Sequence, residues 1–185
     1  DYDCEQTGWL VTPRTRDSIE KVVLSGLPWA CDNGCYSDWQ PDRFVKLLER
    51  VKGQPRLLWV AVPDVVGDHS MTLRRFRQWR DLFVAWGVPM AFVLQDGVDS
   101  EEVPWELIKA VFIGGTTVWK MGPDAAALVA EAKGRGLWVH MGRVNSIRRM
   151  HYARSIGCDS VDGTQWSRFR DTYMGRARAG LENPF

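Results

Sequence analysis

Seven short apolar runs alternate with longer amphipathic segments along this chain of 185 residues. The amphipathic segments carry apolar positions at helical spacing over residues 16–25, 41–52, 70–86, 103–109, 123–135 and 146–156. The runs between them are typical of buried strands and read "GWLVTP", "LPWACDNG", "RLLWVAVPD", "VPMAFVLQDG", "AVFIGGTT", "LWVHMG" and "CDSVDG". Repeated strand–helix units predict parallel strands joined by right-handed crossovers, and therefore an α/β protein.

Helix-terminal residues support several of these segments. Ser70 is placed to cap the helix that follows it, and Pro123 suits a first helical turn. Gly87, Gly136 and Gly157 stand where helices are expected to end. We therefore expect discrete helices separated by tight turns.

Nearly every apolar run ends in a glycine or a polar residue. This pattern helps to decide between an open doubly wound sheet and a (βα) barrel. An open doubly wound sheet gathers its ligand contacts at one switch point and has a GxGxxG turn after its first strand, which this chain lacks. In a TIM-type (βα) barrel the strand ends converge on one mouth. We predict a compact or incomplete TIM-type barrel, because seven short units fall below the about 250 residues of a full one. The predicted mouth residues are Asp32, Asn33, Asp64, Gln95, Asp96, Gly114, Gly115, Thr116, Gly142 and Asp162.

Composition indicates one ordinary globular domain over residues 1–185, with a basic tail from about residue 172. Hydrophobic residues make up 45%, charged residues 25%, and the net charge is +1, as expected for a soluble chain. No run approaches the ~20 apolar residues of a membrane span, no signal-peptide pattern is present, and the missing initiator Met suggests a trimmed start. The cysteines lack CxxC spacing, which disfavours a zinc ribbon and favours reduced thiols in a cytoplasmic protein.

The small net charge hides an asymmetry. Residues 133–185 hold ten basic and four acidic side chains, a net charge of +6. A basic face can steer a polyanion, although solvated helix faces are often basic without a partner. The charge pattern therefore favours nucleic acid only modestly.

Three carboxylates, Asp32, Asp64 and Asp162, follow apolar runs directly or closely. Partial desolvation at such positions raises the basicity of a carboxylate and suits it to acid–base or covalent work. Any one of them alone is more often a helix cap or a turn residue. Three carboxylates at the same end of a barrel indicate a catalytic role more strongly than one does.

Other residues at the predicted mouth have less specific readings. Gly114 and Gly115 allow a flat ligand to lie against the backbone, cradle a phosphate or permit a tight turn. Gln95 offers a donor and an acceptor that suit a nucleobase edge, whereas His140 reads as a satisfied core or rim histidine. The ten tryptophans are mostly core, with one or two free to stack on bases. A metal site could be formed by the aspartates and His69, but no HxH, HExxH or acidic-triplet spacing supports one, so no metal is expected.

Six motifs, taken in order over roughly residues 29–168, resemble the tRNA-guanine (queuine) transglycosylase superfamily. "CDNGCY" is similar to that family's Asp-Ser-Gly-Gly-Phe turn, "VPDVVGDH" to its Phe-Asp-Glu-Cys strand end, and "VLQDG" to its Val-Gln-Gly-Gly. "FIGGTT" is similar to its Gly-Gly-Leu segment, "HMGRVNS" to its Met-Gly-Val-Gly turn, and "GCDSVDG" to its Gly-Val-Asp-Met-Phe-Asp-Cys. Their order, with the last two spaced across one helix, makes the set fairly specific.

The resemblance implies roles for these residues. Asp162 would be the nucleophile that attacks C1′ of a guanosine and forms a covalent sugar–enzyme ester, with Asp32 as general acid and base. Asp64 and Gln95 would read the Watson–Crick edge of the base. The remaining implied substrate-binding residues are Gly114, Gly115, Met141 and Gly142.

The chain departs from the family's tRNA enzymes, which carry a Cys-x-Cys-x-x-Cys plus His zinc site after the nucleophile strand. Here 23 residues follow Asp162 and none is a cysteine, so no zinc subdomain is expected. Cys35 replaces the second glycine of the base turn, and Val65 and Val66 stand in place of Glu-Cys. These features resemble the short phage-type relatives that exchange guanine in DNA for a 7-deazaguanine.

By this resemblance the partners are DNA and a free 7-deazaguanine base, with no cofactor and no membrane, in the host cytoplasm if the protein is phage-encoded. The target guanine must leave the base stack, which costs about a few kcal/mol. The basic residues expected to meet phosphates are Arg143, Arg148, Arg149, Arg168 and Arg170.

Three alternatives stay open. The chain is also compatible with a tRNA-guanine transglycosylase-like enzyme, with a nucleoside hydrolase-like or phosphate-binding barrel that uses "GGTT" as a phosphate site, and with a catalytically inactive nucleic-acid-binding subunit. A homo-oligomer or a partner in a modification complex agrees with any of these. An eighth strand would come from residues outside this sequence, from the tail or from a partner.

Overall fold

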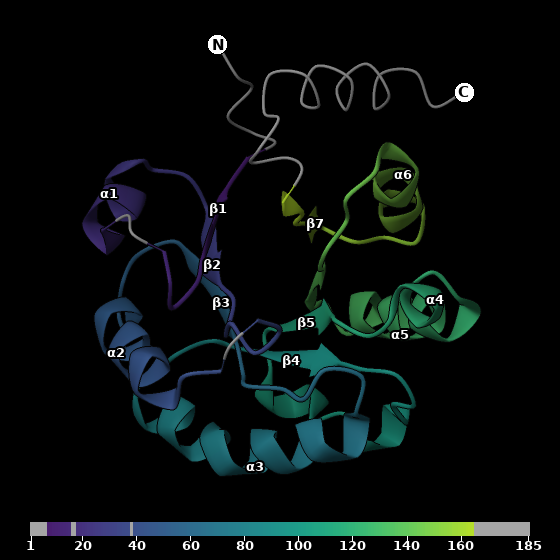
Figure 1. Ribbon diagram of the computed structural model, residues 1–185, viewed down its shortest axis with the longest axis horizontal. Coiled ribbons are helices and arrows are strands. Elements are labelled where there is room, and N and C mark those ends of the chain that lie inside the picture. The colour runs from purple at the N-terminus through teal and green to yellow at the C-terminus, as the bar shows by residue number, and fades with distance from the viewer. Residues whose placement is uncertain (1–6, 16–17, 38, 165–185) are drawn as a thin grey trace.

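The computed structural model describes residues 7–15, 18–37 and 39–164, and its centre is one parallel β-sheet (Figure 1). Within these residues the sheet has seven strands in the order β1-β2-β3-β4-β5-β6-β7, each parallel to its neighbours. The strands are β1 Trp9–Val11, β2 Trp29–Cys31, β3 Leu57–Ala61, β4 Met90–Leu94, β5 Ala110–Ile113, β6 Trp138–Met141 and β7 Ser160–Val161. The predicted number, order of appearance and parallel direction of the strands are confirmed.

Helices connect most of the strands and lie on the outer side of the curved sheet (Figure 1). They are α1 Ile19–Leu24, α2 Pro41–Val51, α3 His69–Ala85, α4 Thr117–Lys120, α5 Pro123–Gly134 and α6 Ile147–Ser155. Pro123 opens α5 as predicted, and Gly87, Gly136 and Gly157 adopt positive φ angles of 62°, 72° and 99° just beyond helix ends.

Two predictions about helices are wrong. Ser70 does not cap α3, because Asp68 lies in extended conformation and its carboxylate accepts the Met71 N–H at 2.9 Å. The expected helix over residues 103–109 is a single 3₁₀ turn, η3 Trp105–Leu107. Seven residues that include Pro104 are too few to offset the cost of nucleating an α-helix.

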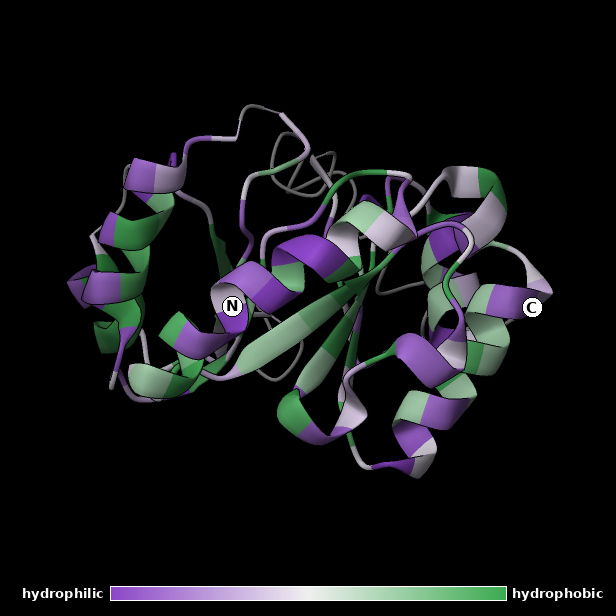
Figure 2. Ribbon diagram, turned by 90° about the horizontal axis from the view of Figure 1, so that it is seen from below, coloured by the Kyte–Doolittle hydropathy of each residue, from purple (hydrophilic) through white to green (hydrophobic). Residues whose placement is uncertain are grey.

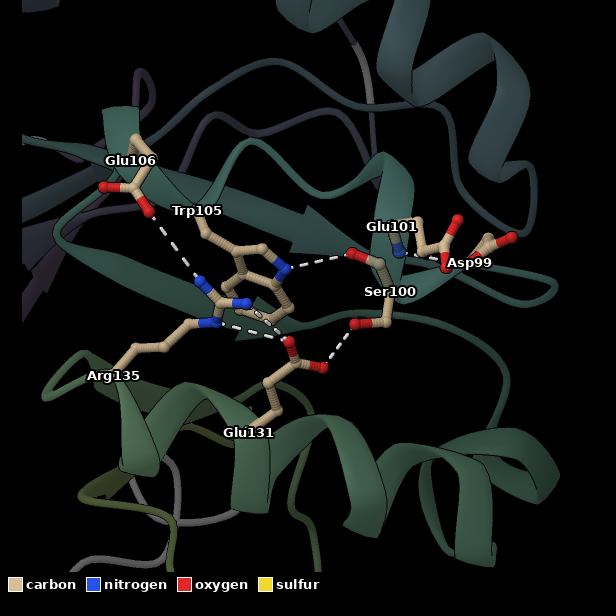
Figure 3. A network of polar contacts seen from close by, with 7 residues as sticks. All are labelled: Asp99, Ser100, Glu101, Trp105, Glu106, Glu131 and Arg135. Atoms are coloured by element: carbon tan, nitrogen blue, oxygen red, sulfur yellow. Dashed lines mark hydrogen bonds and ion pairs between the residues drawn. The ribbon is translucent and has the colours of Figure 1, made fainter.

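The connection from β4 to β5 is therefore built from η2 Ser100–Glu102 and η3, which are tied to α5 by polar contacts (Figure 3). The Trp105 indole N–H donates to the Ser100 carbonyl at 2.9 Å. Glu131 of α5 accepts from the Ser100 hydroxyl and, at 2.9 Å, from the Arg135 guanidinium. Polar contacts to α5 and the burial of Val103 and Ile108 in the core thus hold this connection in place without an α-helix.

Strand alternation divides the sheet into two faces with different packing. One face and the helices form the larger core, which includes Trp29, Phe44, Phe76 and Phe92. The other face carries a smaller cluster that contains strand residues alone: Ala30, Trp59, Ala61, Ala91, Val93 and Ala110, with Leu10, Leu58, Phe112 and Trp138 against them. Four alanines on this inner face leave room for the Trp59 indole, so the concave side is filled by side chains.

The fold class is α/β, with a seven-stranded parallel sheet curled into a half-barrel (Figure 1). Figure 2 shows predominantly hydrophobic strands and helices striped with hydrophilic and hydrophobic positions, as expected when helices cover one face of a sheet. No helix among the described residues is both long and apolar enough to cross a membrane. The predicted basic tail from about residue 172 lies outside the described residues.

Candidate active site

The candidate site lies at the carboxyl edge of the sheet, where the inner face ends. Five of the predicted site residues follow an inner-face position two residues earlier, so the pleat turns them toward the concave side. The pairs are Ala30 and Asp32, Val93 and Gln95, Phe112 and Gly114, His140 and Gly142, and Ser160 and Asp162. The parallel sheet thus brings residues that are up to 130 positions apart to one rim.

Asp162 follows β7 and is held by donors on both carboxylate oxygens. His140 Nε2 lies 3.0 Å from Oδ2, and the Arg143 backbone N–H donates to Oδ1 at 3.1 Å. Burial alone would raise the pKa of Asp162, but the hydrogen bonds from His140 and the Arg143 N–H, together with the Lys120 charge, outweigh it and hold the pKa below its ordinary value. The side chain remains 26% exposed, so an ionised carboxylate faces the mouth.

Asp32 follows β2 and has the opposite shift. Desolvation by burial, followed by the negative charge of Asp162, raises the pKa of Asp32 from 3.8 to about 6. Its Oδ1 accepts the Gly34 N–H at 3.3 Å, which offsets only part of the effect. Asp32 and Asp162 are therefore an electrostatically coupled carboxylate pair with different proton affinities.

Asp64, Asn33 and Gln95 form a buried hydrogen-bonded group beside this pair. Both oxygens of Asp64 accept, Oδ1 from Asn33 Nδ2 at 2.9 Å and Oδ2 from Gln95 Nε2 at 2.6 Å. The Gln95 amide oxygen in turn accepts the backbone N–H groups of Gly67 and Gly115, at 2.9 and 3.0 Å. Burial raises the pKa of Asp64 despite these donors. Base reading by Asp64 and Gln95 stays a prediction.

The glycines at the rim are required by close packing. A Cβ at Gly114 would lie 2.7 Å from Gln95 Nε2, and one at Gly142 would lie 2.5 Å from the Phe112 ring. Even alanine at either position would displace a site residue or the ring beneath it. The predicted Gly114–Gly115 pair therefore closes the wall beside Gln95.

Arg143 spans the mouth from the other side. Its guanidinium donates to the carbonyls of Gly114, at 3.1 Å, and Gly115, and it stacks 4.5 Å over the exposed Tyr36 ring. The residue itself has a positive φ of 58°. The same residue thus binds Asp162 through its backbone and covers the glycine wall with its side chain.

Lys120 and His140 are site residues that the sequence reasoning missed. The Lys120 side chain is buried, its Nζ donates to the Gly142 carbonyl at 2.6 Å, and burial followed by the Arg143 charge lowers its pKa to about 8. His140 was read as a satisfied core or rim residue, and it is indeed 3% exposed, but its ring contacts Asp162. The alternation of β6 could have placed His140 at the site, because it lies two residues before Gly142 on the same face of the strand. No sequence pattern could have placed Lys120 there, because it lies on a helix that was not predicted.

Most donors of the "GGTT" loop are already taken, since the Gly114 and Gly115 N–H groups donate to the Leu94 carbonyl and to Gln95. Asp96 accepts both the Thr116 backbone N–H and the Thr116 hydroxyl, each at 2.6 Å. A phosphate would have to displace this carboxylate from the N-terminus of α4. The loop therefore disfavours the phosphate-binding alternative.

The remaining predicted residues are not all at the rim. Met141 is fully buried in the core beneath the helices, so a substrate contact there would use its backbone. Arg148 and Arg149 lie in the first turn of α6, which the Ser146 hydroxyl caps. Arg168 and Arg170 lie outside the described residues.

The described residues contain no group of three or more His, Cys, Asp or Glu side chains arranged to hold a metal ion. His69 lies 3.2 Å from Glu102 through its Nε2. Cys31, Cys35 and Cys158 are free thiols. Burial raises the pKa of Cys35 to about 12, so this thiol beside the mouth is a poor nucleophile at neutral pH.

Comparisons with known proteins leave the chain unassigned to a family. No family model matches it, and no curated protein matches it. Among solved structures, it is similar to PaMucR phosphodiesterase in a c-di-GMP complex, with 18% identity and a TM-score of 0.45 over 78% of this chain. This chain spans 64% of that neighbour's length, and a likeness at this level carries no argument about function.

Proposed function

We propose that this protein is a compact, incomplete TIM-type barrel that exchanges guanine in DNA for a 7-deazaguanine base through a covalent Asp162–deoxyribose intermediate. The observation that carries the proposal is the Asp32–Asp162 pair. One carboxylate is held ionised and its neighbour has a pKa of about 6, so the two are prepared for different steps. Guanine, DNA and the deazaguanine come from the resemblance to the transglycosylases.

In the first half-reaction, a carboxylate oxygen of Asp162 attacks C1′ as the bond from C1′ to guanine N9 breaks. The transition state resembles an oxocarbenium ion, which an apposed carboxylate stabilises and then traps as an ester. Asp32 donates its proton to the departing guanine. A pKa of about 6 leaves a fraction of Asp32 protonated at neutral pH, as a general acid requires.

In the second half-reaction, the incoming base attacks C1′ and Asp162 leaves as a carboxylate. Asp32, now ionised, accepts the N9 proton of the incoming deazaguanine, so the pair returns to its starting protonation state. The His140 ring and the Arg143 N–H stabilise the carboxylate that is released. No metal or organic cofactor enters either half-reaction.

The buried Asn33–Asp64–Gln95 group forms the proposed floor of the base pocket. Its members are fixed by their own hydrogen bonds before a base arrives, so little side-chain entropy is lost on binding. Both Asp64 oxygens are already paired, so a base edge that presents an acceptor to them would meet the negative charge of the carboxylate with no compensating hydrogen bond. This is the arrangement by which a site rejects a wrong base.

A DNA substrate requires that the guanine be extruded from the duplex before Asp162 reaches C1′. Tyr36 is 66% exposed, and its ring stacks against the Arg143 guanidinium at the mouth. Such a pair is suited to contact neighbouring bases and phosphates. Arg148 and Arg149, with Arg168 and Arg170 beyond the described residues, are the proposed remaining phosphate contacts.

The test is exchange of labelled guanine into duplex DNA and, in parallel, into tRNA, with wild type and Asp162→Asn. We expect exchange into DNA by wild type and a loss of at least about 10⁴-fold in Asp162→Asn. Denaturing gels should show a DNA–protein adduct for wild type only. Asp159→Asn is the matched control, because Asp159 lies at the other end of β7 and is bound to Lys133 and the Val139 N–H.

Other outcomes would replace the proposal. Exchange that survives Asp162→Asn removes the nucleophile assignment, and exchange into tRNA alone moves the substrate to RNA. Release of guanine without exchange indicates a hydrolase. Salt-dependent DNA binding with neither adduct nor exchange would indicate a catalytically inactive nucleic-acid-binding subunit.

A further inference from the structure

A column of polar side chains runs along the inner face of the half-barrel, from the floor of the sheet to Asp162. Trp138 begins β6, His140 follows it on the same face, and Ser160 of β7 is the direct neighbour of His140 in the sheet register. Asp162 stands two residues after Ser160. The four residues are therefore aligned by the pairing of β6 with β7 alone.

The contacts in this column have one consistent assignment of protons. The Trp138 indole can only donate, and its Nε1 lies 2.8 Å from Ser160 Oγ, so Ser160 accepts there. Ser160 Oγ also lies 2.8 Å from His140 Nδ1. Nε2 of His140 faces Asp162 Oδ2 at 3.0 Å, and because an ionised carboxylate can only accept, the proton of a neutral His140 ring lies on Nε2. Nδ1 then accepts the proton of the Ser160 hydroxyl, whose oxygen still accepts from Trp138.

We propose that Trp138, Ser160 and His140 form a relay that selects the Nε2–H tautomer of His140 and thereby orients the nucleophile Asp162. The inference rests on the proposed function for its catalytic consequence, whereas the tautomer itself is a property of the free protein. His140 and Ser160 are positioning residues, since neither contacts the sugar or the base in the proposed reaction.

The relay acts on Asp162 together with one backbone group. His140 donates to Oδ2 and the Arg143 N–H donates to Oδ1, so the plane of the carboxylate is fixed by two donors, one within β6 and one in the turn that follows it. The opposite tautomer would place a lone pair of Nε2 against a carboxylate lone pair. That repulsion would turn Asp162 away from C1′, and a small misplacement of a nucleophile can cost about 100-fold in rate.

Packing prevents the imidazole from escaping this geometry. Its centroid lies 5.0 Å from the Trp59 ring and 4.7 Å from the Phe112 ring. The residue is 3% exposed. The ring therefore cannot rotate to exchange Nδ1 for Nε2 without displacing two aromatic side chains.

The first test is nitrogen-15 NMR of the imidazoles in the free protein. The expected result is a His140 signal pattern with Nε2 protonated and Nδ1 unprotonated. In Ser160→Ala, Nδ1 loses its donor, so we expect either a mixture of tautomers or a protonated ring. A wild-type spectrum with protonated Nδ1, or one unchanged by Ser160→Ala, overturns the relay whatever the reaction is. Trp138→Phe, which leaves the Ser160 proton free to rotate, should shift the pattern in the same direction by less.

The second test measures adduct formation and exchange. We expect Ser160→Ala to lower kcat about 10-fold and His140→Ala about 100-fold, with KM nearly unchanged because the base pocket is intact. His140→Gln, whose amide can still donate to Asp162, should recover part of the loss. An equal loss in Gln and Ala variants, both folded by circular dichroism, contradicts a donor role.

The two tests separate the two ideas. If NMR shows the predicted tautomer but the protein forms no adduct, the relay is supported and the proposed function is rejected. Adduct formation that is indifferent to Ser160→Ala and His140→Gln retains the function and rejects the relay.

Discussion

Two polar networks of this protein use the same kinds of residues in opposite ways. The network of Figure 3, which joins the β4–β5 connection to α5, sets Glu131 against Arg135 at exposed positions. At the mouth, two carboxylates, Asp32 and Asp162, lie close enough for one to raise the pKa of the other. In the first network opposite charges attract, and in the second two carboxylates of like charge lie at a partly buried edge of the sheet.

The two networks therefore contribute to folding stability with opposite signs. The Ser100 hydroxyl and Arg135 lower the pKa of Glu131, so its contacts favour the folded state at neutral pH. Burial and Asp162 raise the pKa of Asp32, so its ionised form opposes folding. An unfavourable charge of this kind marks Asp32 as a candidate functional residue.

Replacing Asp32 by Asn should have the largest effect, because it removes the like-charge interaction with Asp162. The variant loses the proposed general acid and base, so exchange should fall by about 10²–10⁴-fold. It also removes a buried charge, and since the folded carboxyl titrates near 6 and the reference carboxyl at 3.8, the stability of wild type falls as pH rises through this window. Asp32→Asn should therefore be more stable at pH above about 7, by about 1–2 kcal/mol. Denaturant unfolding measures the predicted gain in stability, and labelled-guanine exchange measures the predicted loss of activity. A variant less stable than wild type would contradict the electrostatic argument.

The pH dependence of the first half-reaction tests whether Asp32 and Asp162 have different protonation states. Asp162 is ionised across the neutral range because its pKa is lowered, whereas Asp32 must carry a proton. The kcat/KM for guanine release should therefore be flat just below about pH 6 and should fall about tenfold per unit above it. A profile measured from about pH 5 to pH 8 should lose this limb in Asp32→Asn. An unchanged limb in that variant would assign it to another group.

The smallest effect is expected in the network of Figure 3. Glu131→Gln removes the charge that Arg135 contacts at 2.9 Å, but the pair is solvated, so the loss of stability should stay below about 1 kcal/mol. The pKa of Glu131 is lowered from 4.5, so wild-type stability from this contact is present above that value and lost as pH falls below it. Thermal unfolding at neutral and acid pH tests this, and exchange activity should be unchanged. A large loss of activity would mean that the two networks are coupled.

Much of the site could be predicted because a parallel sheet converts sequence position into spatial position. Each apolar run ends at the same edge, so Asp32, Gln95 and Asp162 could be assigned to one rim before any tertiary contact was known. The alternation within each run also decides which side chains face inward. Local propensity was a weaker guide, as the cap at Asp68 and the 3₁₀ turn at Trp105–Leu107 show.

By itself, the sequence determined the seven strands, their parallel direction and the rim on which the carboxylates stand, because periodicity and strand order are local properties of the chain. Tertiary structure alone decided what each carboxylate can do. The contact of His140 with Asp162 crosses 22 residues and depends on the register of β6 and β7, and the burial of Lys120 depends on how α4 packs against the rim. Proton affinity is set by desolvation and by neighbouring charges, and neither exists until the strands are assembled.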